Sequence, residues 1–278
     1  GAPHPALPVG YGGSTPPHWG LAALIAAAGQ WLAWRERDFA IVPAISLLLS
    51  LVLLAAWPSP TPFWFGVIGL SLLIIHALPL LARLWAIPKK LPPTLELCIA
   101  ALTAAPLTKW HFWSIADASL AMVALGGALL TAAGIGRGWK IEGRTNDSRL
   151  AWLTATSGAL VTLAVLLVLP FWMAPLGIAT VAVALFFFGE AALDPRTERI
   201  VAGFVGAALV ALVATPRALV ELPRLVEGTD GADGTAILRW AGLAAAGLLL
   251  AVRGRSAIIR RLGQVAAALF AYGAIAPF

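Results

Sequence analysis

His76 is the ionisable residue that lies deepest in an apolar run of this sequence, between Phe63 and Arg83. Pro79 follows within one helical turn, and a proline inside a helix frees the carbonyl four residues earlier, here that of Ile75. A histidine beside such an opened turn can line a polar cavity or relay a proton. The alternative, which we favour, is structural: His76 bonds a neighbouring helix or a freed carbonyl.

Glu96 is a second candidate for an intramembrane polar site with His76. It follows Pro92-Pro93 at the start of an apolar run, where the double proline and the helix dipole favour a carboxylate. Lys89 and Lys90 are near enough in the sequence to pair with it. The simpler interpretation is therefore a carboxylate at the membrane interface, which we favour over a functional role.

Asp117 is the third candidate. It lies near the start of the next apolar run, at the opposite face of the membrane from Glu96 and close to Lys109 and His111. Ser114 is a plausible helix N-cap there, with Asp117 three residues later at the capping-box position. The same carboxylate would be needed by a membrane-embedded transferase, for which Asp117 and Glu221 are the two candidates. The simpler interpretation is again an interfacial carboxylate.

Other chemistries have little support in this sequence. The four histidines His4, His18, His76 and His111 fall on different segments, so we expect no metal site. There is no nucleophile elbow and no phosphate-binding loop. The single cysteine, Cys98, cannot form an internal disulfide. We therefore expect no cofactor and no catalytic residue, and we lean against an enzyme.

The elements that carry these residues are strongly apolar: 60% of the 278 residues are hydrophobic and 12% are charged. A soluble domain has roughly 25% charged residues. Residues 170–193 are apolar on every side and match a hydrocarbon core about 30 Å thick. Ten such runs lie near 19–34, 39–57, 63–84, 93–108, 114–136, 150–169, 171–193, 198–215, 236–252 and 257–276. We predict an all-α, polytopic transmembrane bundle of about ten spans, in which the first and fourth runs are short.

Positive charge is distributed unevenly over the loops that this span count produces. One set of alternate loops holds Arg35, Arg37, Arg83, Lys89, Lys90, Arg137, Lys140, Arg144, Arg149, Arg196, Arg199, Arg253, Arg255, Arg260 and Arg261, and the other holds Lys109, Arg217, Arg224 and Arg239. Cytoplasmic loops are enriched in Lys and Arg. The first set is therefore predicted to be cytoplasmic, with both termini on the other side. The net charge of +6 is explained by topology and does not indicate nucleic acid.

Tryptophans open four of the predicted hairpins on the non-cytoplasmic side. Trp19, Trp64, Trp113 and Trp172 each follow a histidine or phenylalanine at the start of an incoming run. Tryptophan prefers the boundary between lipid and water, so we expect interfacial anchors. Their spacings of 45, 49 and 59 residues each cover about one two-helix hairpin, which indicates a hairpin repeat.

These repeated hairpins, with a proline-aromatic turn, an Ala/Leu-rich span and a basic loop, resemble the very large bacterial membrane proteins called domain of unknown function 2339. Residues 149–216, RLAWLTATSGALVTLAVLLVLPFWMAPLGIATVAVALFFFGEAALDPRTERIVAGFVGAALVALVATP, carry the likeness best. The resemblance implies many spans and a location in the cell envelope. It implies no activity and no catalytic residue.

The predicted organisation is a lead at residues 1–18 followed by a helical domain at residues 19–278. The lead is rich in proline and glycine, so we expect it to be flexible. Residues 215–235 form the long non-cytoplasmic loop, amphipathic at first and then acidic. Arg217, Glu221 and Arg224 lie in it and are candidates for contact with a partner. Because the chain ends on Pro277-Phe278, where the next repeat motif would begin, we expect a fragment of a longer protein.

The predicted function is that of an uncharacterised multi-pass protein of the bacterial inner membrane. The leading hypothesis is a structural or assembly component of an envelope complex, in contact with membrane lipids and other membrane proteins. The rival is a transporter or channel for a lipid-like or small solute, with His76, Glu96 and Asp117 along the path. A membrane-embedded transferase is a weaker alternative. We expect no nucleic acid partner.

Overall fold

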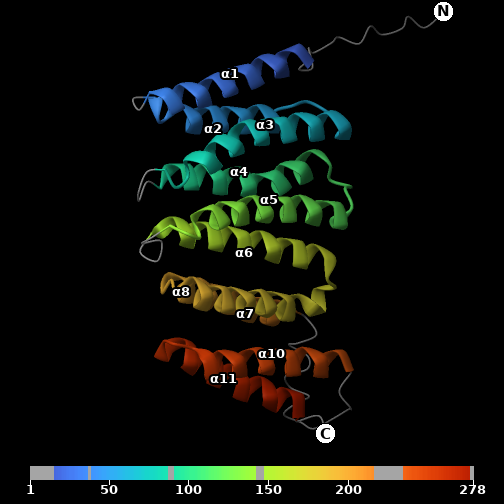
Figure 1. The fold of residues 1–278 in the computed structure, drawn as a ribbon. Helices are drawn as coiled ribbons and strands as arrows, with labels where there is room; N and C mark the ends of the chain where they lie inside the picture. The colour runs from blue at the N-terminus through green and yellow to red at the C-terminus, as the bar shows by residue number, and fades with distance from the viewer. Residues whose placement is uncertain (1–15, 37–38, 87–90, 142–146, 216–233, 276–278) are drawn as a thin grey trace, which may run out of the picture.

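A computed structural model describes residues 16–36, 39–86, 91–141, 147–215 and 234–275 of the chain. These residues contain ten α-helices and no strand. The helices, labelled as in Figure 1, are α1 (Pro16–Arg35), α2 (Val42–Ala55), α3 (Pro62–Arg83), α4 (Pro92–His111), α5 (Asp117–Gly138), α6 (Ser148–Val168), α7 (Ala174–Ala192), α8 (Arg196–Ala214), α10 (Gly234–Arg253) and α11 (Ala257–Ile275). The all-α prediction is confirmed for this part of the chain.

Each helix matches one predicted apolar run, and the ends agree to within about three residues. Proline sets several starts, as in α3 and α4, because its fixed φ and missing N–H suit the first helical turn. Seven helices among the described residues are long and apolar enough to cross a membrane: α3, α5, α6, α7 with its preceding turn at Phe171–Met173, α8, α10 and α11.

The remaining three helices differ from the prediction in length. The first and fourth runs, predicted to be short, form helices of 20 residues in α1 and α4, and neither is among the seven candidate spans. α2 is the short helix, with 14 residues. α1 also begins at Pro16, so the predicted lead ends earlier than residue 18.

The helices lie in a stack that follows the order of the chain, from α1 at one end to α10 and α11 at the other (Figure 1). Each well-packed pair joins a helix to its first or second neighbour among the described helices, such as α1 with α3 or α7 with α10. The closest pairs are the hairpins α5–α6, α7–α8 and α10–α11. Packing restricted to near neighbours is the property of a one-dimensional helical array.

The hydrophobic core is accordingly divided into local clusters instead of one centre. One cluster joins α3, α4, α5 and α6 through residues such as Leu84, Leu97 and Leu153. Another joins α7, α8, α10 and α11 around Trp240 and Phe270. Each helix therefore gains its burial from the hairpins beside it, and large apolar side chains stay exposed along the outer surfaces.

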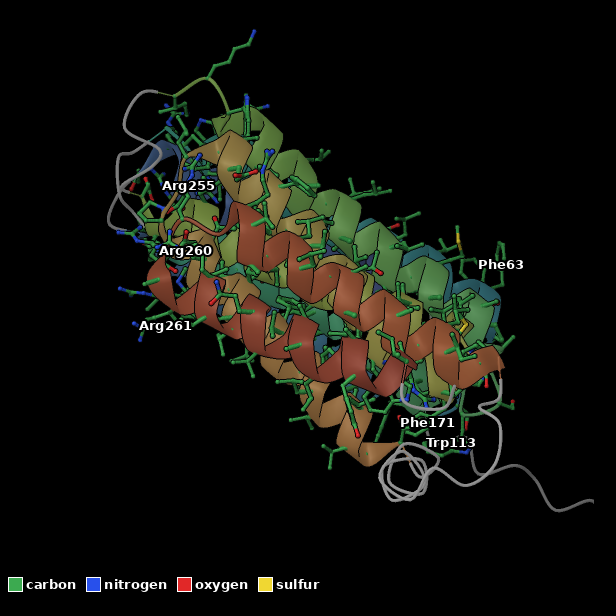
Figure 2. The ribbon with its side chains drawn as sticks, turned by 90° about the horizontal axis from the view of Figure 1, so that it is seen from below. Phe63, Trp113, Phe171, Arg255, Arg260 and Arg261 are labelled. Atoms are coloured by element: carbon green, nitrogen blue, oxygen red, sulfur yellow. The ribbon has the colours of Figure 1, made fainter. Side chains whose placement is uncertain are left out.

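The two ends of the helices differ in chemistry (Figure 2). Arg255, Arg260 and Arg261 lie at one end, which we call the basic end, while Phe63, Trp113 and Phe171 lie at the other, the Phe-Trp end. This separation arises because successive helices run in opposite directions, so that every second link between helices lies at the same end of the stack. The predicted grouping of these loops on opposite sides is present in the described residues.

Candidate functional site

A buried polar network joins the first three helices around His76, which is almost fully buried. Nδ1 of His76, on α3, lies 3.1 Å from Nε2 of Gln30 on α1. Nε2 of His76 lies 3.1 Å from Oγ of Ser50 on α2. Gln30 and Ser50 are also buried. In an apolar environment such contacts remove the cost of unsatisfied polar groups, so the network holds three helices in one register.

The hydrogen-bond donors fix the tautomer of His76. The Ser50 hydroxyl donates its only proton to the carbonyl of Ser46, at 2.9 Å, so its oxygen accepts from Nε2–H of His76. Nδ1 of the neutral ring then accepts from the Gln30 amide. The amide orientation agrees, because Oε1 of Gln30 accepts from the Arg83 guanidinium at 2.7 Å. The ring of His76, the Ser50 hydroxyl and the Gln30 amide thus have complementary partners when His76 is neutral.

Arg83 extends the network toward the basic end and toward Glu96. Glu96, near the start of α4, is buried, and its charge interacts with that of Arg83. Oε2 of Glu96 has no hydrogen-bond partner among the described residues. Glu96 is therefore linked to the His76 network by the electrostatic influence of Arg83 and not by a hydrogen bond that the structure describes. Lys89 and Lys90, the partners expected for Glu96, lie outside the described residues.

An apolar cluster closes this network on the side of the Phe-Trp end. It consists of Trp19, Leu54, Phe65 and Leu72, with Trp19 stacked near Trp57 at a centroid distance of 4.7 Å. Its buried members come from the same three helices, α1, α2 and α3. Trp57 in the link between α2 and α3, Leu107 of α4 and Phe112 at the end of α4 pack against them. The polar groups around His76 are consequently continuous only toward the basic end.

Asp117 does not join His76 and Glu96. It is exposed at the Phe-Trp end and pairs with Lys109 at 3.8 Å, as its neighbourhood in the sequence suggested. The predicted cap is wrong: α5 begins at Asp117 itself, and its N-cap is Ala116, not Ser114. A surface ion pair of this length contributes little to stability, about 0–1 kcal/mol.

A second polar cluster lies at the basic end and was not predicted. Asp147 caps α6 and forms a buried ion pair with Arg149, whose Nε donates to Oδ2 at 2.8 Å. Arg149 also donates to the carbonyl of Leu84 at the end of α3 and stacks 4.4 Å over the Trp85 ring. Trp85 in turn donates to the carbonyl of Gly134 on α5, at 2.8 Å. These contacts tie α3, α5 and α6 together.

The electrostatics of Asp147 follow from this cluster. Burial alone would raise the pKa of its carboxyl, but hydrogen bonds and positive charge from Arg149, with a contribution from Arg196, outweigh it and hold the pKa below its ordinary value. Asp147 is thus a charged partner that stabilises the helix junction.

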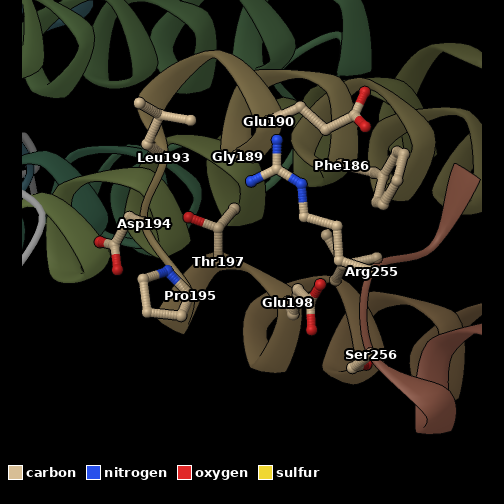
Figure 3. Close-up of a pocket in the computed structure, with 11 residues that line it drawn as sticks. Phe186, Gly189, Glu190, Leu193, Asp194, Pro195, Thr197, Glu198, Arg255 and Ser256 are labelled. Atoms are coloured by element: carbon tan, nitrogen blue, oxygen red, sulfur yellow. The ribbon is translucent and has the colours of Figure 1, made fainter.

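A cavity of about 280 Å³ opens at the basic end between the α7–α8 turn and the α10–α11 link (Figure 3). It is lined by Glu190, Asp194, Thr197 and Glu198 from the first hairpin and by Arg255 and Ser256 from the second, over an apolar floor of Phe186 and Val201. The Arg255 side chain reaches toward the end of α7, near Glu190 (Figure 3).

The predicted interfacial anchors occupy different environments. Trp19 is 6% exposed within its apolar cluster, whereas Trp113 is 81% exposed. Trp64 is also exposed, and Trp172 is half-buried. The partner candidates Arg217, Glu221 and Arg224 lie outside the described residues.

Sequence reasoning missed the residues that surround His76 and the buried arginines. Gln30 and Ser50 gave a usable signal, because each is a polar residue within an apolar run. Arg149 and Arg239 were counted as loop charges, but both belong to helices and are buried, Arg239 fully. Within the described ranges no three His, Cys, Asp or Glu residues are grouped as metal ligands would be.

No protein-family model matches this chain, and no match was found among curated proteins or among solved structures.

Proposed function

We propose that this chain is a membrane-embedded structural component, a multi-pass helical array of the inner membrane that organises other membrane proteins. The observation that carries this proposal is the linear order of packing, in which each well-packed pair of described helices joins near neighbours along the stack. Such an array has no common central site that could open in turn to each side of the membrane, as a transporter requires. It also offers long outer surfaces to partners. Seven apolar helices of spanning length support the membrane location.

We place the basic end in the cytoplasm, because positive loops are hard to translocate, and both termini on the other side. α1, α2 and α4 join the seven helices that are both long and apolar enough to span, as further spans, which gives the expected ten. The closed hydrogen bonding around His76 supports a structural role for that residue, since its partners are satisfied within the protein.

The outer face of α11 offers the sharpest test. Ile258, Leu262, Val265, Leu269 and Tyr272 recur every three or four residues on this last helix of the stack and are all exposed. A photo-reactive residue at Val265 or at Tyr272 should cross-link, in native membranes, to the same discrete protein. The matched control is Phe270, which faces the core of the same helix and should give no such adduct.

A transporter is the second candidate, and the His76 network favours it because ionisable groups within a membrane commonly mark solute or proton paths. Cross-linking from α11, combined with a flux measurement, distinguishes the structural component from the transporter. If Val265 and Tyr272 give only lipid adducts, and purified protein in vesicles carries a pH-dependent flux that His76→Leu abolishes without loss of stability, the structural proposal is wrong.

A further inference from the structure

The cavity at the basic end contains polar atoms whose hydrogen-bonding capacity the protein leaves unused. Asp194 is 3% exposed, and one of its oxygens, Oδ1, caps α8 by accepting from the backbone of Arg196 at 2.9 Å. Its other oxygen, Oδ2, has no hydrogen-bond partner among the described residues, and neither has Oγ1 of Thr197, which is 1% exposed. Both residues line the cavity. An unsatisfied buried group costs about 1–3 kcal/mol, so these atoms are available to bind a ligand.

Side chains of both charges line the cavity. Glu190, Asp194 and Glu198 provide carboxylates from the α7–α8 hairpin, while Arg255 provides a guanidinium from the opposite link (Figure 3). At the rim, Arg253 lies 3.5 Å from Glu190. The carboxylates do not form a metal-ligand group. The complementary ligand therefore carries an organic cation and an anion a few ångströms apart, as a zwitterion does.

A separate apolar groove lies farther along the same helices. It is lined by Ala182 on α7, Val205 on α8 and Leu250 on α10, with further small and aliphatic residues toward the Phe-Trp end. Ala182 and Val205 each lie one turn from a residue of the polar cavity, Phe186 and Val201 respectively. The groove arises because α8 packs on α6 and α7, while α10 packs on α7 and α11. A polar pocket one helical turn from an apolar groove suits an amphiphile.

We propose that this combined site binds one phospholipid whose headgroup carries a primary amine. The ammonium lies among the three carboxylates and donates N–H groups to Oδ2 of Asp194 and Oγ1 of Thr197. The phosphate lies on Arg255, and one acyl chain follows the groove between α8 and α10. A quaternary ammonium has no N–H to donate, and an anionic headgroup would meet three carboxylates, so both are disfavoured. This inference goes beyond the proposed structural role and does not depend on it.

The test uses the full chain, purified in detergent and freed of lipid, with binding measured by native mass spectrometry. Phosphatidylethanolamine, phosphatidylcholine and phosphatidylglycerol with identical acyl chains are compared. We expect phosphatidylethanolamine to bind about tenfold more tightly than either of the others, a difference of about 1.4 kcal/mol. Equal affinity for phosphatidylethanolamine and phosphatidylcholine would overturn the proposal.

Two conservative variants locate the site. Asp194→Asn keeps an oxygen to cap α8 but replaces the free acceptor by an amide N–H₂, and Glu198→Gln removes a charge from the cavity. Each should lower the preference for phosphatidylethanolamine by at least about threefold while leaving the melting temperature of the lipid-free protein unchanged. Glu36→Gln, which alters an exposed acid at the end of α1, should leave the preference as it is. If the preference survives both cavity variants, the site is wrongly placed.

Free phosphoethanolamine distinguishes a lipid from a soluble ligand with the same headgroup. If the acyl groove contributes, this compound should displace the phospholipid only at concentrations at least about a hundredfold higher than those of the lipid. If it competes as strongly as the lipid itself, the site recognises a soluble phosphoamine and the lipid assignment is overturned.

Discussion

Nε2 of Gln30 lies 3.1 Å from Nδ1 of His76, and this contact joins α1 to α3 within the apolar part of the stack. Because Oε1 of the same amide accepts from Arg83, Gln30 can face His76 only as a donor. The ring is therefore held in its neutral form with the proton on Nε2. Protonation of His76 would put a hydrogen on Nδ1, opposite the N–H₂ group of Gln30. The Gln30 amide would then have to turn its oxygen toward the ring and give up its hydrogen bond with Arg83.

The first prediction compares two serines that make the same bond within their helices. Ser50 and Ser71 each donate to the carbonyl four residues earlier, but only Ser50 also accepts from His76. Ser50→Ala should lower the free energy of unfolding by about 1–3 kcal/mol, because a buried N–H of His76 loses its partner. Ser71→Ala, on an exposed face, should change it by less than about 0.5 kcal/mol. Thermal unfolding in detergent measures both, and equal effects would contradict the network.

The second prediction concerns the acid stability that Asp147 provides. Its pKa is lower in the folded protein than in the unfolded chain, so its stabilisation is present above the ordinary aspartate value of about 4 and is lost as the pH falls further. Asp147→Asn should cost about 3–5 kcal/mol at neutral pH, since Arg149 is left buried without its charged partner. The difference between wild type and variant should shrink below pH 4. A difference independent of pH would show that the charge of Asp147 is not involved.

A third prediction uses two glycines on α5. A Cβ atom at Gly138 would lie 2.2 Å from ring atoms of Trp85, whereas one at Gly136 would meet nothing within 4 Å. Gly138→Ala should therefore displace Trp85 from Gly134 and Arg149 and destabilise the protein by about 1–3 kcal/mol. Gly136→Ala should be neutral or stabilising, because alanine favours the helix by up to about 1 kcal/mol. Chemical unfolding measures the stability of both variants. If Gly136→Ala were the more destabilising substitution, the packing of Trp85 against Gly138 would be contradicted.

The orientation in the membrane can be measured with single cysteines. Ser114 is exposed at the Phe-Trp end and Lys140 is exposed just beyond α5 at the basic end. In intact cells an impermeant maleimide should label Ser114→Cys and should label Lys140→Cys only after permeabilisation. The native Cys98 is buried and should contribute no background. The opposite pattern would place the basic end outside the cytoplasm.

The last prediction separates the tryptophans by environment. Trp19→Ala should lower stability by about 3–5 kcal/mol, because it empties a packed cluster beside Trp57. Trp113→Ala should have little effect on unfolding in detergent, since the ring is exposed. In vesicles, however, brominated lipids should quench Trp113 most strongly when the bromine lies near the headgroups, as expected for an interfacial anchor. Quenching strongest at the bilayer centre would contradict that role.

The sequence by itself determined the helices and their alternation. An apolar run in lipid must satisfy its backbone hydrogen bonds internally, so run length and proline positions predict where α3 or α10 begins and ends. The same local rules grouped the Arg and Phe-Trp turns at opposite ends. The lengths of α1, α2 and α4 were predicted less closely, because a polar residue near the end of an apolar run belongs either to the helix or to the link between helices.

Only the tertiary structure decided which side chains meet. Gln30 contacts His76 across 46 residues, and Arg149 reaches the carbonyl of Leu84 across 65. Asp117, chosen with His76 and Glu96 for its charge, lies elsewhere because α5 enters at the other end of the stack. Nearly uniform apolar faces do not specify which helices become neighbours or how they are rotated. Close packing and the pairing of a few buried polar groups make that choice.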